Sequence, residues 1–199
     1  MRCLLLAFTL LLGACSTVPN IKVSAPSAPY YEVISLSGRL SVSYQQQGKA
    51  QSLQGKFNWD QTASTTHISL FTPLGQTMAQ IVIEPDRAML QQTGEALRIA
   101  SDVSVLTSDT LGWPLPVTGL KEWLQGFYSN ALGKQQVIAR DVQAGFINNG
   151  WEVHYVQWQD DVSGFSIPKR IDLKHMSKRH SEINLKIVID TWAPSRTPK

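Results

Sequence analysis

The alternation of apolar and polar residues constrains the fold of this chain more than any other feature. From residue 34 to residue 45, every second residue is apolar, aromatic or glycine, and the residues between are polar or charged. Side chains of a β-strand point alternately to its two faces, so this period of two predicts a half-buried strand. Residues 53–60 and 183–190 repeat the pattern. The apolar faces of the three segments are Ile34, Leu36, Gly38, Leu40, Val42 and Tyr44; Leu53, Gly55, Phe57 and Trp59; and Ile183, Leu185, Ile187 and Ile189.

Shorter runs and turn signals predict the remaining strands. Residues 46–49 form the first turn, and Asn148-Asn149-Gly150 is a strong hairpin signal because Asn and Gly tolerate positive φ. Gly38 and Gly55 lie on apolar faces, where a missing side chain allows sharp sheet curvature or the close approach of another element. The further strands are expected at 68–70, 79–83, 89–92, 96–99, 142–147, 151–158 and 167–175.

Between the strands the period changes to that of a helix. Ser-Asp at the start of the segment 101–111 caps a first helix, and the run Gly-Trp-Pro-Leu-Pro at 112–116 breaks it. Leu120, Trp123 and Leu124 follow at i, i+3 and i+4, which predicts a second helix that ends at the next glycine.

These elements together predict a mainly β fold. A long antiparallel sheet of about ten or eleven strands has one apolar face that must be covered, and two helices of about ten residues each cover little of it. The economical arrangement is a sheet curled on itself, with the helices laid across its opening. Its interior is either a lipid-sized cavity or a filled core. The pattern alone favours filling, because small-barrel interiors are commonly filled by side chains.

The N-terminus predicts export and lipid attachment. Arg2 supplies a positive charge, residues 3–12 are almost unbroken apolar, and Leu-Gly-Ala-Cys ends at Cys15. The apolar run is too short to span a bilayer, which takes roughly 20 residues. The tetrapeptide resembles the bacterial lipobox, which implies a cleaved signal peptide at 1–14 and acyl chains on Cys15. The alternative is an ordinary signal peptide with a chance cysteine.

The residues after the cysteine predict a membrane-tethered domain. By the same resemblance, Ser16 points to the outer membrane, because lipoproteins kept in the inner membrane typically carry Asp there. Several acyl chains give firm attachment. Residues 15–30 contain Pro19, Pro26 and Pro29 and are expected to form a flexible tether. Residues 31–199 are long enough for one domain with its own core.

Composition excludes several classes of function. Both cysteines lie within the first 15 residues, so the folded domain has no disulfide and no catalytic thiol. The chain has 18 basic and 15 acidic residues, and removal of Arg2 with the signal leaves a net charge of +2. That charge is too small to argue for a nucleic-acid surface. We expect a monomer that binds no nucleic acid.

The sequence also lacks the signatures of common active sites. It has neither a G-x-S-x-G elbow nor a P-loop. His175 and His180 flank a predicted turn rich in basic residues, which is more typical of a solvated loop than of a metal site. His67 and His154 lie in predicted strands with no paired acid evident in the sequence. We therefore expect no enzymatic activity, no cofactor and no metal.

Several motifs between residues 34 and 192 resemble the LolB family of outer-membrane lipoprotein receptors. The most specific stretch runs from Gly112 to Gly126. The matching residues are Gly38-Arg39, Phe57-x-Trp59-x-Gln61, Pro73-Leu74-Gly75, Gly112-x-Pro114-x-Pro116, Leu120-Lys121-x-Trp123-Leu124-x-Gly126 and the strand that ends at Trp192.

The resemblance implies an unclosed antiparallel β-barrel with short helices covering the mouth of a hydrophobic cavity. It implies a non-enzymatic receptor that accepts lipoproteins from the periplasmic carrier LolA and inserts them into the inner leaflet of the outer membrane. Partners would be a LolA-like carrier with its cargo, the acyl chains, and the membrane. Only Pro29–Val33 precedes the first strand, so an N-terminal lid helix is expected to be short or absent. The implied cavity and lid residues are Leu36, Leu40, Phe57, Trp59, Ile68, Leu70, Ile81, Leu106, Leu120, Trp123 and Leu124.

The loop Pro73-Leu74-Gly75 carries a second implied role. Thr72 to Gly75 fits a turn with Pro at the second position and Gly at the fourth, and an apolar residue at a turn tip is unexpected. Either Leu74 folds back on Phe71 or Met78, or it is exposed and touches the membrane or the incoming lipid. By resemblance, the family uses this leucine for membrane delivery.

A different binding module stays open as the alternative function. A lipoprotein that carries another apolar ligand, or that acts as an envelope scaffold, would share the anchor and the sheet.

Overall fold

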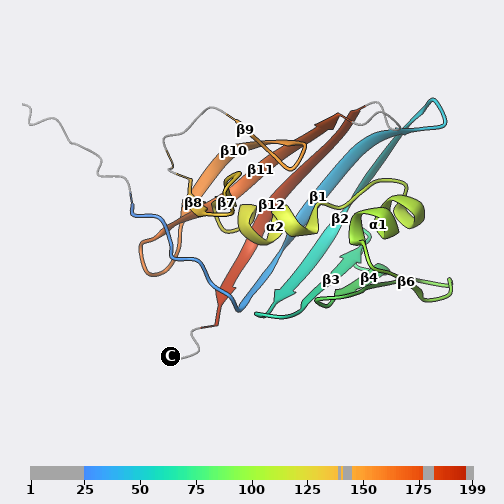
Figure 1. Ribbon diagram of the computed structural model, residues 1–199, viewed down its shortest axis with the longest axis horizontal. Coiled ribbons are helices and arrows are strands. Elements are labelled where there is room, and N and C mark those ends of the chain that lie inside the picture. The colour runs from blue at the N-terminus through green and yellow to red at the C-terminus, as the bar shows by residue number, and fades with distance from the viewer. Residues whose placement is uncertain (1–24, 139, 141–144, 177–181, 196–199) are drawn as a thin grey trace, which may run out of the picture.

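The computed structural model describes residues 25–138, 140, 145–176 and 182–195. The predicted signal peptide, Cys15 and Ser16 lie outside these residues, as do His180 and part of the strand predicted at 142–147. A ten-stranded antiparallel sheet in the order β6-β5-β4-β3-β2-β1-β12-β11-β10-β9 dominates the fold. The sheet curves, and the helices lie across one of its faces (Figure 1). Within the described residues the edge strands β6 and β9 do not pair, so the barrel is unclosed, as predicted.

The strands of the large sheet follow the predicted segments closely. They are β1 (Ile34–Gln46), β2 (Lys49–Gln61), β3 (Thr66–Phe71), β4 (Thr77–Ile83), β5 (Ala88–Gln92), β6 (Arg98–Ala100), β9 (Phe146–Asn148), β10 (Trp151–Asp160), β11 (Ser166–Met176) and β12 (Glu182–Pro194). The helices are α1 (Val103–Leu111) and α2 (Val117–Trp123), and a separate two-stranded sheet consists of β7 (Phe127–Ser129) and β8 (Gln135–Val137).

Both predicted hairpin turns form, each over two residues. Gln47 and Gly48 have φ values of 52° and 75° and join β1 to β2 in continuous register from Ile34↔Gln61 to Gln46↔Lys49. Asn149 and Gly150, with φ values of 51° and 78°, join β9 to β10. Two consecutive positive φ values match the right-handed twist of the flanking strands.

The two glycines on the apolar faces allow close backbone approach. A Cβ at Gly38 would overlap the carbonyl oxygen of Val188, and a Cβ at Gly55 would overlap the carbonyl oxygen of Phe71. The pairing of β1 with β12 also shifts register between Ser37 and Gly38. Such a bulge bends a strand and increases its local twist, so this position contributes to the curvature of the sheet.

The helices begin and end where their caps predict. The Asp102 carboxylate accepts hydrogen bonds from the Ser104 and Val105 amides at 2.7 and 3.1 Å. Gly112, with a φ of 85°, ends α1. The regular part of α2 ends at Trp123, and a tight turn continues to Gly126, which has a φ of 82°.

Four local differences separate the structure from the sequence pattern. The strand expected at 96–99 is β6, shifted to residues 98–100. Of the strand expected at 142–147, the structure describes residues 145–147, and only Phe146 and Ile147 lie in a strand, which is β9. Asn148 belongs to that strand rather than to the turn. The small sheet of β7 and β8 was not predicted, because strands of three residues are too short to show a period.

The segment before β1 packs against the sheet. The amide of Ala28 donates to the carbonyl of Ser166, whose own amide donates to Pro26, and Ala28 is buried. Residues 25–33 contain no helix. In the described parts of the chain we find no helix long and apolar enough to cross a membrane.

Candidate functional site

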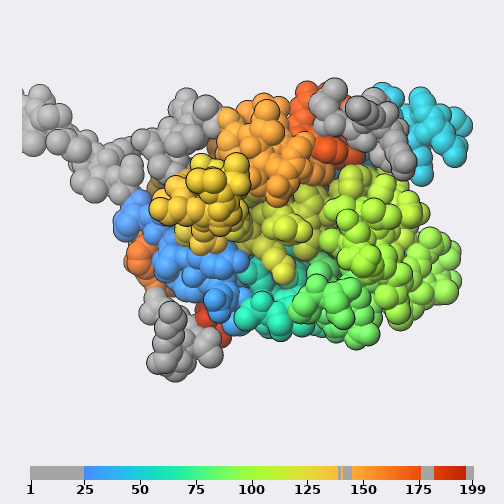
Figure 2. Space-filling model, in the orientation of Figure 1, coloured from blue at the N-terminus to red at the C-terminus, as the bar shows by residue number. Residues whose placement is uncertain are grey.

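The inner face of the sheet and α2 enclose a small apolar cavity. Its floor comes from β1, β2, β3 and β12, and its roof from α2 and the residues on either side of that helix. Only apolar side chains line it: Leu40, Phe57, Trp59, Ile68, Leu70, Leu115, Leu120, Leu124, Leu185 and Ile187. Figure 2 shows this side of the molecule covered by the residues of α1, α2 and the β7–β8 sheet, coloured yellow-green to gold.

The cavity is nearly filled by its own lining. Its volume is about 20 Å³, which is room for about one water molecule and far less than an acyl chain. Side chains therefore fill the interior in this structure, as the alternation of the sequence favours.

Polar contacts fasten one end of α2. The buried hydroxyl of Tyr155 donates to the carbonyl oxygen of Trp123 at 2.7 Å. Burial raises the pKa of Tyr155 well above its ordinary value, so this hydroxyl keeps its proton. Just beyond the helix, the side-chain amide of Gln125 accepts from the Tyr31 amide at 2.9 Å and donates to the Tyr31 carbonyl at 3.0 Å. The C-terminal end of α2 is thus tied to β10 and to the segment before β1.

The opposite end of α2 is held mainly by apolar packing. Pro116 precedes the helix and makes no side-chain capping hydrogen bond. The nearest hydrogen bond to a side chain is from the Leu115 amide to the Thr107 hydroxyl, at 2.9 Å. Leu115 and Val117, on either side of Pro116, are both buried, so this end of α2 is packed into the core.

The structure brings most of the predicted cavity residues together. Seven of them line the cavity, namely Leu40, Phe57, Trp59, Ile68, Leu70, Leu120 and Leu124. Leu36, Ile81, Leu106 and Trp123 do not line it, but are buried in the same hydrophobic core. Sequence reasoning missed Leu115, which follows a helix-breaking proline, and it missed Leu185 and Ile187, whose place on the apolar face of the last strand was a usable signal.

The loop between β3 and β4 presents Leu74 to solvent. The Gly75 amide donates to the Thr72 carbonyl at 2.9 Å, and the Thr72 amide donates to the Gln76 carbonyl at 2.8 Å. Gly75 has a φ of 91°. This closed turn leaves Leu74 91% exposed, so its side chain does not fold back on Phe71 or Met78.

Two histidines of the described residues make local contacts rather than a metal-binding cluster. No group of three or more His, Cys, Asp or Glu residues within the described part of the chain is arranged to hold a metal. The Nδ1 of His175 donates a hydrogen bond to the Gly150 carbonyl oxygen at 2.6 Å, and the ring stacks on Trp151. His154 contacts Glu152 on the exposed surface. Both histidines are accounted for by local contacts.

Comparisons with known proteins agree with this arrangement. Residues 32–192 match the family model described as "Outer membrane lipoprotein LolB". A protein named "Outer-membrane lipoprotein LolB" from Cupriavidus taiwanensis is 32% identical, with 96% of each chain covered. A protein of the same name from Cupriavidus necator is 33% identical, over 93% of this chain and 92% of the relative.

A solved structure shares the fold at low sequence identity. It is a DUF1329 family protein from Desulfovibrio piger, with a TM-score of 0.50 and 10% identity, over 85% of this chain and 88% of that chain. That likeness concerns the fold alone. The family predicted from the motifs is confirmed by the sequence matches: the chain belongs to the outer membrane lipoprotein LolB family.

Proposed function

We propose that this protein is an outer-membrane receptor that accepts lipoproteins from a LolA-like carrier and inserts them into the inner leaflet of the outer membrane. One observation carries the proposal: in a chain of this family, a purely apolar cavity lies beneath a helix that is fastened at one end. The transfer is passive and not enzymatic.

The cavity binds acyl chains by replacing its own internal contacts. Opening the roof separates Leu115, Leu120 and Leu124 from the strands, and the entering chain covers the surfaces that opening exposes. Burial of each methylene is worth about 0.8 kcal/mol before such losses. Because the closed receptor already buries its lining, net binding is much weaker than the acyl burial alone. Weak net binding suits a receptor that must release its cargo.

Release is the proposed role of the Leu74 loop. An exposed leucine on a closed turn can enter the membrane interface without loosening the sheet that carries it. Once there, it offers departing acyl chains an apolar path that avoids water. The acylated Cys15, proposed from the Leu-Gly-Ala-Cys sequence, would keep the loop near the same membrane.

Transfer of a labelled lipoprotein in a purified system tests the proposal. Carrier loaded with cargo is mixed with this protein, and the label is expected to move to it without nucleotide. A receptor that binds tighter than the carrier by about 1.4 kcal/mol holds a tenfold excess of cargo. If no cargo moves while the protein binds other apolar ligands, the protein is a different binding module. A need for ATP in the purified step would contradict passive transfer.

A further inference from the structure

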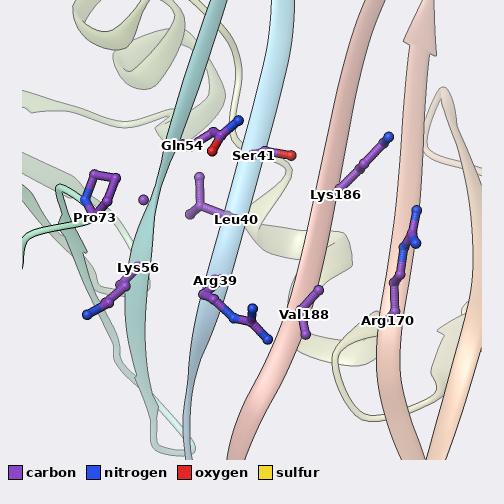
Figure 3. A pocket seen from close by; sticks show the side chains of 10 residues that line it. Arg39, Leu40, Ser41, Gln54, Lys56, Pro73, Arg170, Lys186 and Val188 are labelled. Carbon is purple, nitrogen blue, oxygen red and sulfur yellow. The ribbon is translucent and has the colours of Figure 1, made fainter.

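A basic groove lies on the outer face of the sheet, away from the apolar cavity. Its lining residues come from β2, β1, β12 and β11 together with the Leu74 loop, and its volume is about 470 Å³. Figure 3 shows Lys56, Arg39, Lys186 and Arg170 on these four neighbouring strands, with Pro73 beside Lys56.

Strand register brings these cations close together. Lys56 is directly opposite Arg39, and both Arg39 and Arg170 are opposite Val188. Lys186 lies two residues from Val188 on the same face. Directly opposed like charges destabilise a sheet, so this arrangement works against folding unless an anion lies nearby.

Acidic neighbours neutralise only part of this charge. Asp190 binds Arg39 at 2.9 Å, and Asp172 binds Arg170 at 2.8 Å. The pKa of Asp190 is lowered, chiefly by its hydrogen bonds with Arg39. Among the residues that the structure describes, Lys56 and Lys186 form no ion pair, and both are exposed. The groove therefore keeps a net positive charge.

The groove adjoins the exposed Leu74 in the loop between β3 and β4. Lys56 is paired with Phe71, the last residue of β3, and Pro73 forms part of the groove wall. Leu74 is the next residue and is 91% exposed. An apolar side chain beside a cluster of cations matches the lipid interface, where hydrocarbon lies beneath anionic phosphate groups.

We propose that this groove binds the phosphate groups of anionic phospholipids while Leu74 enters the membrane. The inference rests on the membrane-delivery role proposed for Leu74 and adds the lipid class that this loop prefers. Attraction between lysine and an anionic membrane amounts to about 1 kcal/mol per residue, or roughly a fivefold change in binding. Binding through the groove should weaken as salt is raised.

Vesicle binding by the mature chain with Cys15→Ala tests the proposal without an acyl anchor. Within the described residues, the buried hydrophobic side chains lie between Ala28 and Ile189, and circular dichroism checks that the variant folds. Vesicles contain phosphatidylcholine alone or with phosphatidylglycerol. We expect phosphatidylglycerol to strengthen binding. The double variant Lys56→Gln/Lys186→Gln should bind vesicles with phosphatidylglycerol about 25-fold more weakly than the parent chain does. Its binding to pure phosphatidylcholine should be unchanged.

A matched double variant separates the groove from net charge. Lys49→Gln/Lys134→Gln removes two exposed lysines that are outside the groove and should bind phosphatidylglycerol like the parent chain. Equal losses in the two double variants, or no preference for phosphatidylglycerol in the parent, would overturn the inference. So would normal vesicle binding by Lys56→Gln/Lys186→Gln with slower uptake from the carrier, because the groove would then dock an acidic protein. Failure of cargo uptake by the parent, with vesicle binding intact, would instead count against the proposed receptor function.

Discussion

Replacement of Leu74 by glutamate should separate folding from membrane delivery. The leucine is 91% exposed, and the turn that presents it is closed by backbone hydrogen bonds and by the Thr72 hydroxyl, which accepts from the Gln76 amide at 3.1 Å. None of these bonds involves the Leu74 side chain. Exposed substitutions usually change the free energy of unfolding by no more than about 0.5 kcal/mol. The free energy of unfolding of Leu74→Glu should therefore be close to that of the parent protein.

The same substitution should have a large effect on the free energy of inserting the loop into the membrane. Burial of a leucine side chain contributes about 2 kcal/mol, and the variant loses this contribution. A carboxylate that reaches the hydrocarbon adds a further penalty of roughly 3 kcal/mol. The loss therefore lies between about 2 and 5 kcal/mol, depending on how deep the side chain must go. That corresponds to membrane delivery slowed by roughly 30-fold to several thousandfold.

Two transfer assays on the same protein preparation, from carrier to receptor and from receptor to liposomes, test this prediction. Uptake of labelled lipoprotein from the carrier should be normal in Leu74→Glu, and transfer from the loaded variant to liposomes should fail. Leu132, in the turn between β7 and β8, is also 91% exposed, so Leu132→Glu is a control with the same added charge. Unfolding of Leu74→Glu would refute the exposed position of the residue. Equal delivery by both variants would place the delivery step elsewhere on the molecule.

Three further predictions concern the anchor, the sheet and the helix. Mass spectrometry of the mature N-terminus should show acyl chains on Cys15, and an unmodified N-terminus at another residue would exclude the lipid anchor. Gly38→Ala should lower the free energy of unfolding in urea by about 1–3 kcal/mol, because the added methyl overlaps the carbonyl of Val188; unchanged stability would show that the strands can shift there. Tyr155→Phe removes the hydrogen bond to the Trp123 carbonyl and should reduce stability by about 1 kcal/mol while speeding cargo uptake, because the C-terminal end of α2 is then held less tightly; unchanged uptake would mean that this end of α2 does not move.

The large sheet could be predicted because its strands carry one buried face each. Burial alternates along β1 from Ile34 to Val42 in step with the sequence, and the same holds for most of β12. The helix ends were also readable, since Asp102 and Gly112 act through local backbone geometry. These signals lie within a few residues of the element that they define.

The features that the sequence did not reveal depend on contacts between distant residues. Gln125 is buried because it binds the backbone of Tyr31, 94 residues earlier, and nothing near it in the chain predicts that contact. The cavity volume is set by how closely Leu115 and Leu124 approach the strands, and an alternation pattern carries no information at that scale. The basic groove could not be predicted from the sequence, because Lys56, Arg39 and Arg170 are far apart in the chain and come together only through the register of the strands.

The two faces of the sheet suit forces of different kinds. Inside, Phe57 and Leu185 contact only apolar neighbours in the cavity, so cargo retention depends on apolar burial and is little affected by salt. Outside, Lys56 and Lys186 act through charges in water, which salt screens. Because alternate residues of the same strands form both surfaces, the sheet can engage a charged membrane without exposing its cargo to the same electrostatic field. A receptor built in this way can be drawn to the membrane by charge and still release its cargo by differences in apolar burial alone.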